Sequence, residues 1–399
     1  MEYNDLKVNN IDDFEEPHRD YSSPIQESPS NLEEKYYPSN NYSKSWGTEN
    51  PYSAIVLADA IESYLLEHST DSIIVEKKVV SEFKYEFDKS CDVLLEGVKV
   101  FVIDSILVQY RAIWQNFFIT SNKPIDKLVE EIDKYIRTKN KLIGRNYSYT
   151  PTPNKGVILV PARPNTMSFD DIVVGEKIKE LIVDNTVFHL QHMDVNNGII
   201  ITGPPGCGKS MLCGAVITEA CKEGTTAITC STFPFFPVLE EIANLFLPKA
   251  LIILEDIDTY AESRHNVPNQ NLGALLQYLN GVNGRNGKTV YIATTNYPEL
   301  LDEAIKNRPV RFNVKVNLTF LTNDEIVILL QKLYKSQELN NIDRCFNKNL
   351  TGSHLEEIYR RSVLQHKKTG ISICKAFDVS VSEVLETFFT SRSQAGFTL

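Results

Sequence analysis

Apolar residues follow two kinds of spacing in the second half of this 399-residue chain. Short apolar runs typical of buried strands are separated by longer stretches in which apolar residues recur every three or four positions, as in helices. The strand-like runs are Gly198–Thr202, Thr226–Thr229, Ala250–Leu254 and Thr289–Thr294, and the helical stretches are Lys209–Ala220, Val238–Phe246 and Leu272–Leu279. This alternation predicts an α/β fold, with a parallel sheet and crossover helices.

A helical subdomain is expected after the α/β region. Two segments there, Thr322-x-x-Glu325 and Ser353-x-x-Glu356, precede apolar runs with helical periodicity. Both have the spacing of a capping box, in which two side chains satisfy backbone N–H groups at the start of a helix. We therefore assign residues 167–318 to the α/β subdomain, residues 319–390 to a C-terminal helical lid and residues 391–399 to a tail.

A separate small α+β domain is expected over residues 51–143. Apolar residues recur at helical spacing after Pro51 and again after Pro124, and five strand-like runs lie between these helices. The five runs are Ile73–Val80, Lys84–Phe87, Val93–Leu95, Val98–Leu107 and Tyr110–Thr120. Residues 144–166 are rich in Tyr, Pro and Asn, which predicts a linker with one strand near Val157–Val160.

The first 50 residues differ in composition from the rest. They hold eleven acidic and four basic residues, so −7 of the net charge of −11 lies here, among repeated Ser, Asn, Pro and Tyr. Such a segment cannot bury enough apolar surface to offset its ordering entropy, which predicts a disordered acidic tail. A second interpretation is a docking arm that anchors on a partner through aromatic side chains. These are Tyr21, Tyr36, Tyr37, Tyr42 and Trp46.

Composition narrows the functional classes. With 41 basic and 52 acidic residues, the chain lacks the basic surface that sequence-independent binding to nucleic acid or anionic lipid requires. Its seven cysteines show no zinc-site spacing, which predicts reduced thiols. The first residues do not resemble a signal peptide, and charged residues interrupt the most apolar window, Val98–Ile119. We therefore expect a soluble, cytoplasmic protein without a membrane span.

A phosphate-binding loop joins the first strand of the α/β region to its helix. The segment Gly203-Pro-Pro-Gly-Cys-Gly-Lys-Ser210 has the full G-x-x-x-x-G-K-[ST] pattern, whose glycines let backbone N–H groups point at phosphate oxygens. Lys209 would neutralise the β- and γ-phosphates and the Ser210 hydroxyl would bind Mg²⁺, so ATP and Mg²⁺ are the expected cofactors. The nucleotide-binding residues expected here are Gly203, Pro204, Pro205, Gly206, Cys207, Gly208, Lys209, Ser210 and Met211.

An acidic motif is expected beside this loop. The apolar run Leu251–Leu254 ends in Glu255 and Asp256, where a parallel strand reaches the phosphate side of the sheet. One carboxylate should hold the water shell of the metal, and the other should orient and deprotonate the attacking water. We therefore expect Ser210, Glu255 and Asp256 at the metal.

With both motifs in place, residues 168–390 resemble the AAA family of ATPases, in the branch with a second region of homology. Phe169–Gly175 is similar to the family's adenine-contacting hinge, Leu275–Val282 to a helix-ending stretch, and Thr351–Leu355 to the start of the lid helix. The implied fold is an α/β P-loop NTPase core with a helical lid. The resemblance adds nucleotide contacts outside the loop, namely Asp171, Ile172, Val173, Gly352 and Ser353.

The resemblance also implies catalytic groups on two further segments. Asn296 ends a strand where the family carries sensor 1, which helps to place the lytic water. Asn307–Phe312 matches the R-P-G-R-F pattern, which supplies Arg308 and Arg311 to the γ-phosphate of a neighbouring subunit. An arginine supplied in trans raises the rate by about 10³-fold or more. The resemblance therefore implies a homo-oligomeric ring, a hexamer or heptamer, because a monomer would have an incomplete site.

Two positions depart from the family's pattern. The usual order at the strand end is Asp then Glu, whereas this chain has Glu255 then Asp256. By register, Glu255 takes the metal-side position and Asp256 the base position, and which of the two is the base stays open. The same inversion is a feature of the mitochondrial AAA ATPases that assemble respiratory complexes. The second departure is R-P-V-R for R-P-G-R, which keeps both arginines but changes the turn.

Three functions are compatible with these motifs. The first is an ATP-hydrolysing oligomeric AAA ring that remodels or translocates a protein partner of unknown identity. Its grip on the partner would come from Phe233, Phe235 or Phe236, although these rings could equally pack beneath the helix that follows. The second is a nucleic-acid-associated accessory ATPase, which the acidic composition does not favour. The third is a nucleotide-dependent scaffold with little turnover, which the Glu-Asp order allows.

Overall fold

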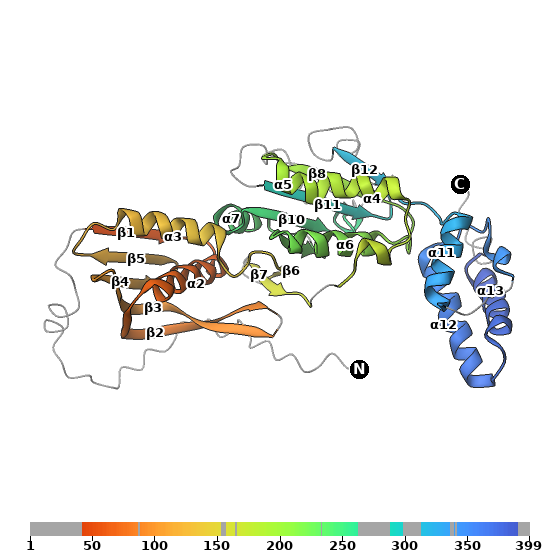
Figure 1. Ribbon diagram of the computed structural model, residues 1–399, viewed down its shortest axis with the longest axis horizontal. Helices are drawn as coiled ribbons and strands as arrows, with labels where there is room; N and C mark the ends of the chain where they lie inside the picture. The colour runs from red at the N-terminus through yellow and green to blue at the C-terminus, as the bar shows by residue number, and fades with distance from the viewer. Residues whose placement is uncertain are drawn as a thin grey trace, which may run out of the picture.

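The computed structural model describes residues 42–86, 88–152, 157–163, 166–232, 234–261, 288–297, 313–335, 339 and 341–389. They form an N-terminal unit, a central α/β unit and a C-terminal helical unit, which follow one another along the long axis of the molecule (Figure 1). This architecture confirms the α/β core, the small N-terminal α+β domain and the helical lid that the sequence predicts.

The N-terminal unit is a five-stranded antiparallel sheet packed against two helices, with the strand order β1-β5-β4-β3-β2 (Figure 1). Its elements are β1 (Tyr42–Gly47), α2 (Pro51–His68), β2 (Asp71–Glu86), β3 (Lys89–Ile103), β4 (Ile106–Ile113), β5 (Asn116–Ser121) and α3 (Asp126–Thr138). α2 begins where Pro51 presets the backbone and the Asn50 side chain accepts the Tyr52 N–H at 2.7 Å.

The N-terminal unit departs from the sequence prediction at its start. It begins at Tyr42 rather than at residue 51, because β1 pairs with β5 along its whole length. The Trp46 ring donates a hydrogen bond to Asp133 at 2.7 Å, so that side chain anchors within its own unit and not on a partner. Tyr42 is the first residue of β1 and is 40% exposed, whereas Tyr21, Tyr36 and Tyr37 lie outside the described residues.

The strands of this unit also divide differently from the prediction. β2 is one long strand where two were expected, and it pairs with β3 through several register shifts. β3 ends in a turn at Asp104 and Ser105, and β4 ends in a turn at Trp114; all three residues have positive φ. Apolar residues precede and follow both turns. Hydrophobic pattern alone does not reveal such turns, because they contain no glycine or proline.

The central sheet has seven strands in the order β12-β8-β11-β10-β9-β6-β7, and all neighbours are parallel except β6 and β7. The strands are β6 (Asn146–Pro151), β7 (Val157–Pro161), β8 (Asn197–Thr202), β9 (Thr226–Cys230), β10 (Lys249–Leu254), β11 (Lys288–Thr295) and β12 (Val314–Asn317). The helical segments are η2 (Phe169–Asp171), α4 (Glu176–Val183), η3 (Asp184–Phe188), α5 (His189–His192), α6 (Lys209–Lys222), α7 (Phe236–Phe246) and α8 (Asp258–Ala261).

The predicted linker over residues 144–166 contributes two strands to this sheet. β6 pairs in parallel with β9, and β7 extends the edge as its antiparallel partner. Tyr147, Tyr149 and Leu159 are buried there. β7 confirms the strand expected near Val157–Val160. The assignment to a linker is wrong for β6, because the aromatic side chains that looked like linker composition fill the core.

The C-terminal unit packs its helices around a core of its own. Its elements are α11 (Asn323–Tyr334), η6 (Ile342–Cys345), α12 (Gly352–Thr369) and α13 (Ile373–Phe389). The capping box of Thr322 and Glu325 is confirmed. The second predicted box is wrong, since Thr351 caps α12 and the His354 Nδ1 accepts the Thr351 N–H at 3.0 Å.

The N-terminal and central units share one hydrophobic core. Ile61 of α2 and Ile132 of α3 lie in the same buried cluster as Phe246 of α7 and Ile252 of β10. The other face of the central sheet packs against α6 in a second cluster, which includes Leu212. The N-terminal unit is thus fixed to one face of the central sheet rather than tethered to it.

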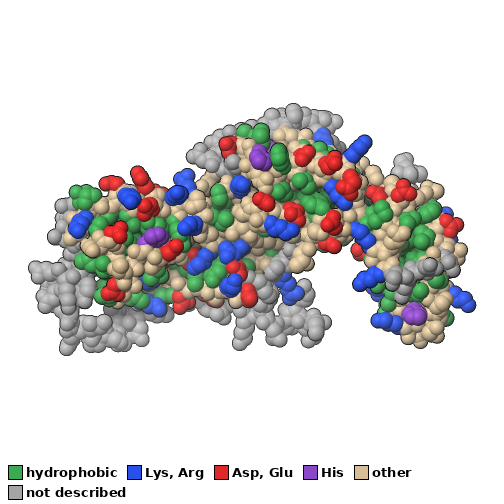
Figure 2. Space-filling view, viewed as in Figure 1, with side chains coloured by type: hydrophobic (Ala, Val, Ile, Leu, Met, Phe, Trp, Pro, Cys, Tyr) green, Lys and Arg blue, Asp and Glu red, His purple; other side chains and the backbone are tan. Residues whose placement is uncertain are grey.

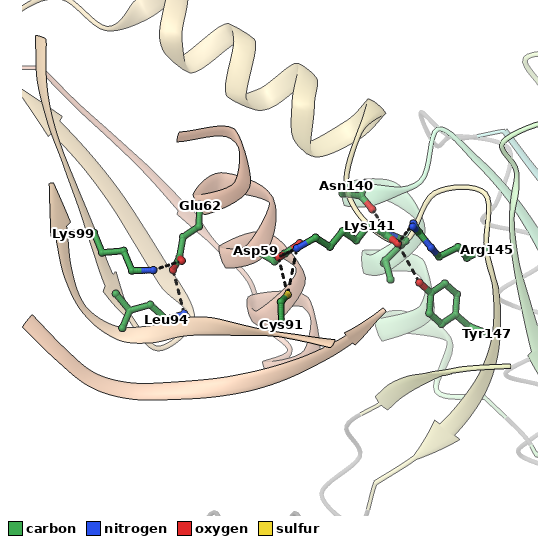
Figure 3. Close-up of polar contacts among 10 residues, drawn as sticks. Asp59, Glu62, Cys91, Leu94, Lys99, Asn140, Lys141, Arg145 and Tyr147 are labelled. Atoms are coloured by element: carbon green, nitrogen blue, oxygen red, sulfur yellow. Dashed lines mark hydrogen bonds and ion pairs between the residues drawn. The ribbon is translucent and has the colours of Figure 1, made fainter. Parts of the chain in front are cut away.

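The segment between α3 and β6 forms a polar joint between these two units (Figure 3). The Asn140 side chain donates to the Ile136 and Phe246 carbonyls, both at 2.6 Å, and so ties the end of α3 to the end of α7. Lys141 Nζ reaches Asp59 Oδ1 at 2.5 Å within the N-terminal unit. Asp59 is 5% exposed and also accepts a hydrogen bond from the Cys91 thiol at 3.3 Å, so the ion pair compensates the charge of a buried carboxylate.

Replacing Asn140 with alanine should lower the free energy of unfolding by about 2–3 kcal/mol, because two buried carbonyl groups would lose their donor. Chemical denaturation measures this effect. A matched control is Thr138→Ala at the exposed end of the same helix, where the hydroxyl bonds only the Lys134 carbonyl, and the expected change is within about 0.5 kcal/mol. An Asn140→Ala protein as stable as the control would contradict the bridging role of this side chain.

Candidate functional site

The phosphate-binding loop lies between β8 and α6, at the carboxyl end of the parallel strands. Three of its residues, Gly203, Gly206 and Gly208, have positive φ values of 151°, 78° and 95°. At Gly203 an added Cβ would lie 2.3 Å from the Leu318 carbonyl oxygen, so the chain following β12 leaves room only for glycine. These glycines therefore serve both the curl of the loop and its packing.

Lys209 is the first residue of α6, and its side chain folds back over the loop. Nζ donates to the Gly203 carbonyl at 2.8 Å, to the Pro204 carbonyl at 3.1 Å and to Asn296 Oδ1 at 2.6 Å. The residue is 7% exposed. Its ammonium is thus held by three oxygen atoms inside the curve of the loop, where the sequence motif predicts phosphate groups.

The acidic pair follows β10 and its two carboxylates have different partners. Glu255 Oε2 accepts a hydrogen bond from the Ser231 hydroxyl, at the end of β9, at 2.8 Å. Asp256 Oδ1 accepts one from the Asn296 amide, after β11, at 3.3 Å. Since β11 lies between β10 and β8 in the sheet, Asp256 is directed toward β11 and the phosphate loop, whereas Glu255 is held beside the end of β9.

Asn296 connects the two motifs. Its amide nitrogen donates to Asp256 and its amide oxygen accepts from Lys209, so one side chain joins the loop lysine to the strand-end carboxylate. Its backbone N–H is held by Asp258 Oδ1 at 3.3 Å. The structure thus brings together three of the residues singled out in the sequence, from β8–α6, β10 and β11.

The segment predicted to contact adenine packs beside α6. Ser168 and Asp171 form a capping box around η2, and hydrogen bonds from Ser168 hold the pKa of Asp171 below its usual value. Ile172 is buried with the core on the α6 face of the sheet, and Val173 is partly exposed. Lys332 of α11 donates to the Asp170 carbonyl, which connects this segment to the lid.

The lid contacts the phosphate-binding loop directly. The Ser353 N–H, at the start of α12, donates to the Gly206 carbonyl at 3.2 Å, and Gly352 lies beside the same carbonyl. A Cβ on Gly206 would lie 2.6 Å from the Ser353 hydroxyl. The two residues that the sequence placed at the nucleotide therefore lie against the loop.

Several residues of the sequence analysis fall outside the described part of the chain. They are Arg308, Arg311, the stretch Leu275–Val282 and Phe233. Of the other two rings in the aromatic segment, Phe236 is 4% exposed and belongs to the core beneath α7, whereas Phe235 is 42% exposed. Phe236 as a partner-gripping ring is therefore wrong, and the hypothesis stays available to Phe235.

Sequence reasoning missed the residues that hold the acidic pair. Ser231 bonds Glu255, and Thr294 accepts the Asp256 N–H at 3.0 Å through its hydroxyl. Asp258, 6% exposed, supports Asn296. Each of these residues lies close in sequence to a recognised motif. The signal that could have found Ser231 and Thr294 is their position, since both are small polar residues at the carboxyl ends of strands, β9 and β11.

The sheet and the glycine-rich loop have the architecture of an α/β P-loop NTPase core. Residues 199–320 match the model of the family described as "ATPase family associated with various cellular activities (AAA)". Residues 199–320 therefore form a domain of the AAA type, as their motifs indicate.

Three relatives show how far the likeness extends. The chain is 24% identical over 247 residues to a "Putative cell division cycle ATPase" of Plasmodium falciparum, which covers 55% of this chain and 19% of the relative. It is 29% identical over 181 residues to an "ATP-dependent zinc metalloprotease FtsH" of Helicobacter felis (40% and 28%). It is 27% identical over 226 residues to the "Peroxisomal ATPase pex6" of Schizosaccharomyces pombe (50% and 24%). The chain thus spans less than a third of each of these relatives.

Among the residues that the structure describes, no helix is both long enough and apolar enough to cross a membrane.

Proposed function

We propose that this chain hydrolyses ATP, and that it works as a homo-oligomeric ring that remodels or translocates a protein partner. The observation that carries the ATPase is the hydrogen-bonded series from Lys209 through Asn296 to Asp256. It places a cation, an amide and a carboxylate in contact at the carboxyl edge of the sheet, which is the set that phosphoryl transfer to water requires.

The loop residues fit a nucleotide triphosphate. The glycines adopt the positive φ values that the curl of the loop needs, and they place no Cβ between the backbone and a ligand. The Lys209 ammonium is the charge that would bind phosphates. Ser210 is exposed at the start of α6, and its hydroxyl with Glu255 and Asp256 makes an all-oxygen set suited to Mg²⁺. When bound, Mg²⁺ would neutralise charge on the β- and γ-phosphates.

We assign the general base to Asp256. Its carboxylate is turned toward the phosphate-loop side and shares the Asn296 amide with Lys209, so it is the carboxylate able to accept a proton from a water oriented by Asn296. Glu255 is turned toward β9 and Ser231, and we assign it to the metal's water shell. The inverted order in the sequence therefore still allows hydrolysis.

The oligomer follows from the arginines. Within the described residues, Lys209 is the basic side chain that contacts Asn296, the residue proposed to orient the attacking water. Any further positive charge at the γ-phosphate would therefore come from another segment. Arg308 and Arg311 are proposed to supply it to a neighbouring subunit, in a ring of six or seven copies. An isolated chain would then bind ATP but turn it over slowly.

The partner is proposed to be a protein. Phe235 stands 42% exposed at the start of α7, and its backbone N–H is fixed by the Tyr149 hydroxyl at 2.7 Å, which makes a rigid apolar contact for an extended polypeptide. Against nucleic acid, Figure 2 shows basic side chains interspersed with acidic ones rather than gathered in a stripe on the visible face.

Steady-state phosphate release per chain, measured over a range of protein concentrations, tests this proposal. Turnover that rises with concentration to a plateau is the expected result. ATP binding without turnover at any concentration would instead favour the nucleotide-dependent scaffold. Salt-sensitive binding to DNA on filters would favour the nucleic-acid accessory.

A further inference from the structure

The turn that carries Asp256 has an unusual backbone. Its φ is 46°, in the left-handed region that side chains with a Cβ rarely adopt, and which Asp and Asn tolerate better than Glu does. The Glu255 N–H still bonds the Cys230 carbonyl of β9, as a continued strand would. The chain therefore turns out of the strand at Asp256, and this turn brings Asp256 beside β11.

Thr294 of β11 accepts two hydrogen bonds from this turn. Its hydroxyl oxygen accepts the Asp256 N–H at 3.0 Å, and its carbonyl accepts the Ile257 N–H at 2.9 Å. Thr294 itself is 2% exposed, so its hydroxyl and carbonyl are shielded from water. As a β-branched residue in a strand, threonine has few side-chain rotamers, and its hydroxyl is therefore held in one place.

We propose that Thr294 is a positioning residue for ATP hydrolysis. Its hydroxyl fixes the backbone of Asp256 in the left-handed conformation and thereby aims the carboxylate at Asn296. This inference rests on the proposed ATPase and on the assignment of the base to Asp256. It gives a physical reason for the Glu-Asp order, because the left-handed backbone at the second of these two positions favours the shorter acid.

Thr294→Val and Thr294→Ser test the proposal. Valine keeps the shape and removes the acceptor, and serine keeps the acceptor. We expect valine to lower kcat between about 10-fold and 100-fold, with KM and the Kd for a non-hydrolysable ATP analogue within about 3-fold of wild type. Serine should retain most of the wild-type kcat. Thr289→Val, at the far end of the same buried strand, is the matched control and should leave kcat unchanged.

Hydrogen–deuterium exchange supplies a readout independent of turnover. In protein without nucleotide, the amides of residues 255–257 should exchange faster in Thr294→Val than in wild type or Thr294→Ser. In the Asp256→Asn background, the valine substitution should cause no further loss of kcat, since the residue it positions no longer acts as a base. An additive loss, or unchanged exchange, would overturn the proposal.

Failure of this inference and failure of the ATPase are distinguishable. If wild type turns over ATP and Thr294→Val does so equally fast, the positioning role is wrong and the ATPase stands. If wild type does not turn over ATP at any concentration, the ATPase itself is wrong. If valine lowers the melting temperature and kcat together while serine does the same, Thr294 supports only the fold.

Discussion

Asp256→Asn should reduce ATP turnover between about 100-fold and 1,000-fold while leaving ATP binding nearly intact. The amide cannot accept the proton of the attacking water, but it has the same shape. Asparagine also tolerates the φ of 46° at this position and keeps an oxygen for the Asn296 amide. The structural change should therefore be small, and steady-state kcat beside the Kd for ATP is the measurement.

Glu255→Gln is the matched comparison for this prediction. It makes the same chemical change one residue away, on the carboxylate that Ser231 holds toward β9. We expect it to raise the Mg²⁺ concentration needed for half-maximal turnover. If Glu255→Gln abolished kcat and Asp256→Asn did not, the two roles would have to be exchanged.

Lys209→Ala should weaken ATP binding between about 10-fold and 100-fold and abolish measurable turnover. A charged donor to phosphate contributes about 1.5–3 kcal/mol, and each 1.4 kcal/mol changes a dissociation constant about tenfold. The substitution also leaves Asn296 Oδ1 without the ammonium that bonds it at 2.6 Å. Isothermal titration with ATP and with ADP measures the effect, which should be larger for ATP.

A lysine at the other end of α6 provides the control for this substitution. Lys222 ends the same helix and pairs with Glu219 on the surface at 2.8 Å. Lys222→Ala should change neither the ATP affinity nor turnover. Equal losses in the two variants would show that the helix, and not the Lys209 ammonium, accounts for the effect.

The parts of the molecule best predicted from the sequence are those in which local pattern and chemistry agree. The parallel strands from β8 to β11 are continuous apolar runs, since both of their faces are buried, and the glycine-rich loop has one structural solution. Residues before the loop were harder to place. β1 lies in an acidic segment and β6 in one rich in Tyr and Pro, and each pairs with a strand distant in sequence, β5 and β9 respectively. β7, which was expected near Val157–Val160, pairs with the neighbouring β6.

The residues that orient the site were not predictable for a different reason. Ser231 and Thr294 act through hydroxyl groups whose partners are set by strand order, which residue spacing does not reveal. Phe236 was one of three similar rings. It is buried because α7 begins at this residue and places its side chain in the core, whereas Phe235, just before the helix, is exposed. Tertiary contacts thus determine which of several chemically equivalent residues is used.

The most direct test of a shared-site ATPase ring is a mixing experiment with two inactive variants. Asp256→Asn subunits keep the proposed trans arginine, and Arg311→Ala subunits keep a complete phosphate loop and base. If sites form between neighbouring copies, mixing the two proteins should restore turnover, with a maximum near equal amounts, although each alone is inactive. Absence of turnover at every ratio, in mixtures shown to co-assemble, would contradict a site completed by the neighbouring subunit.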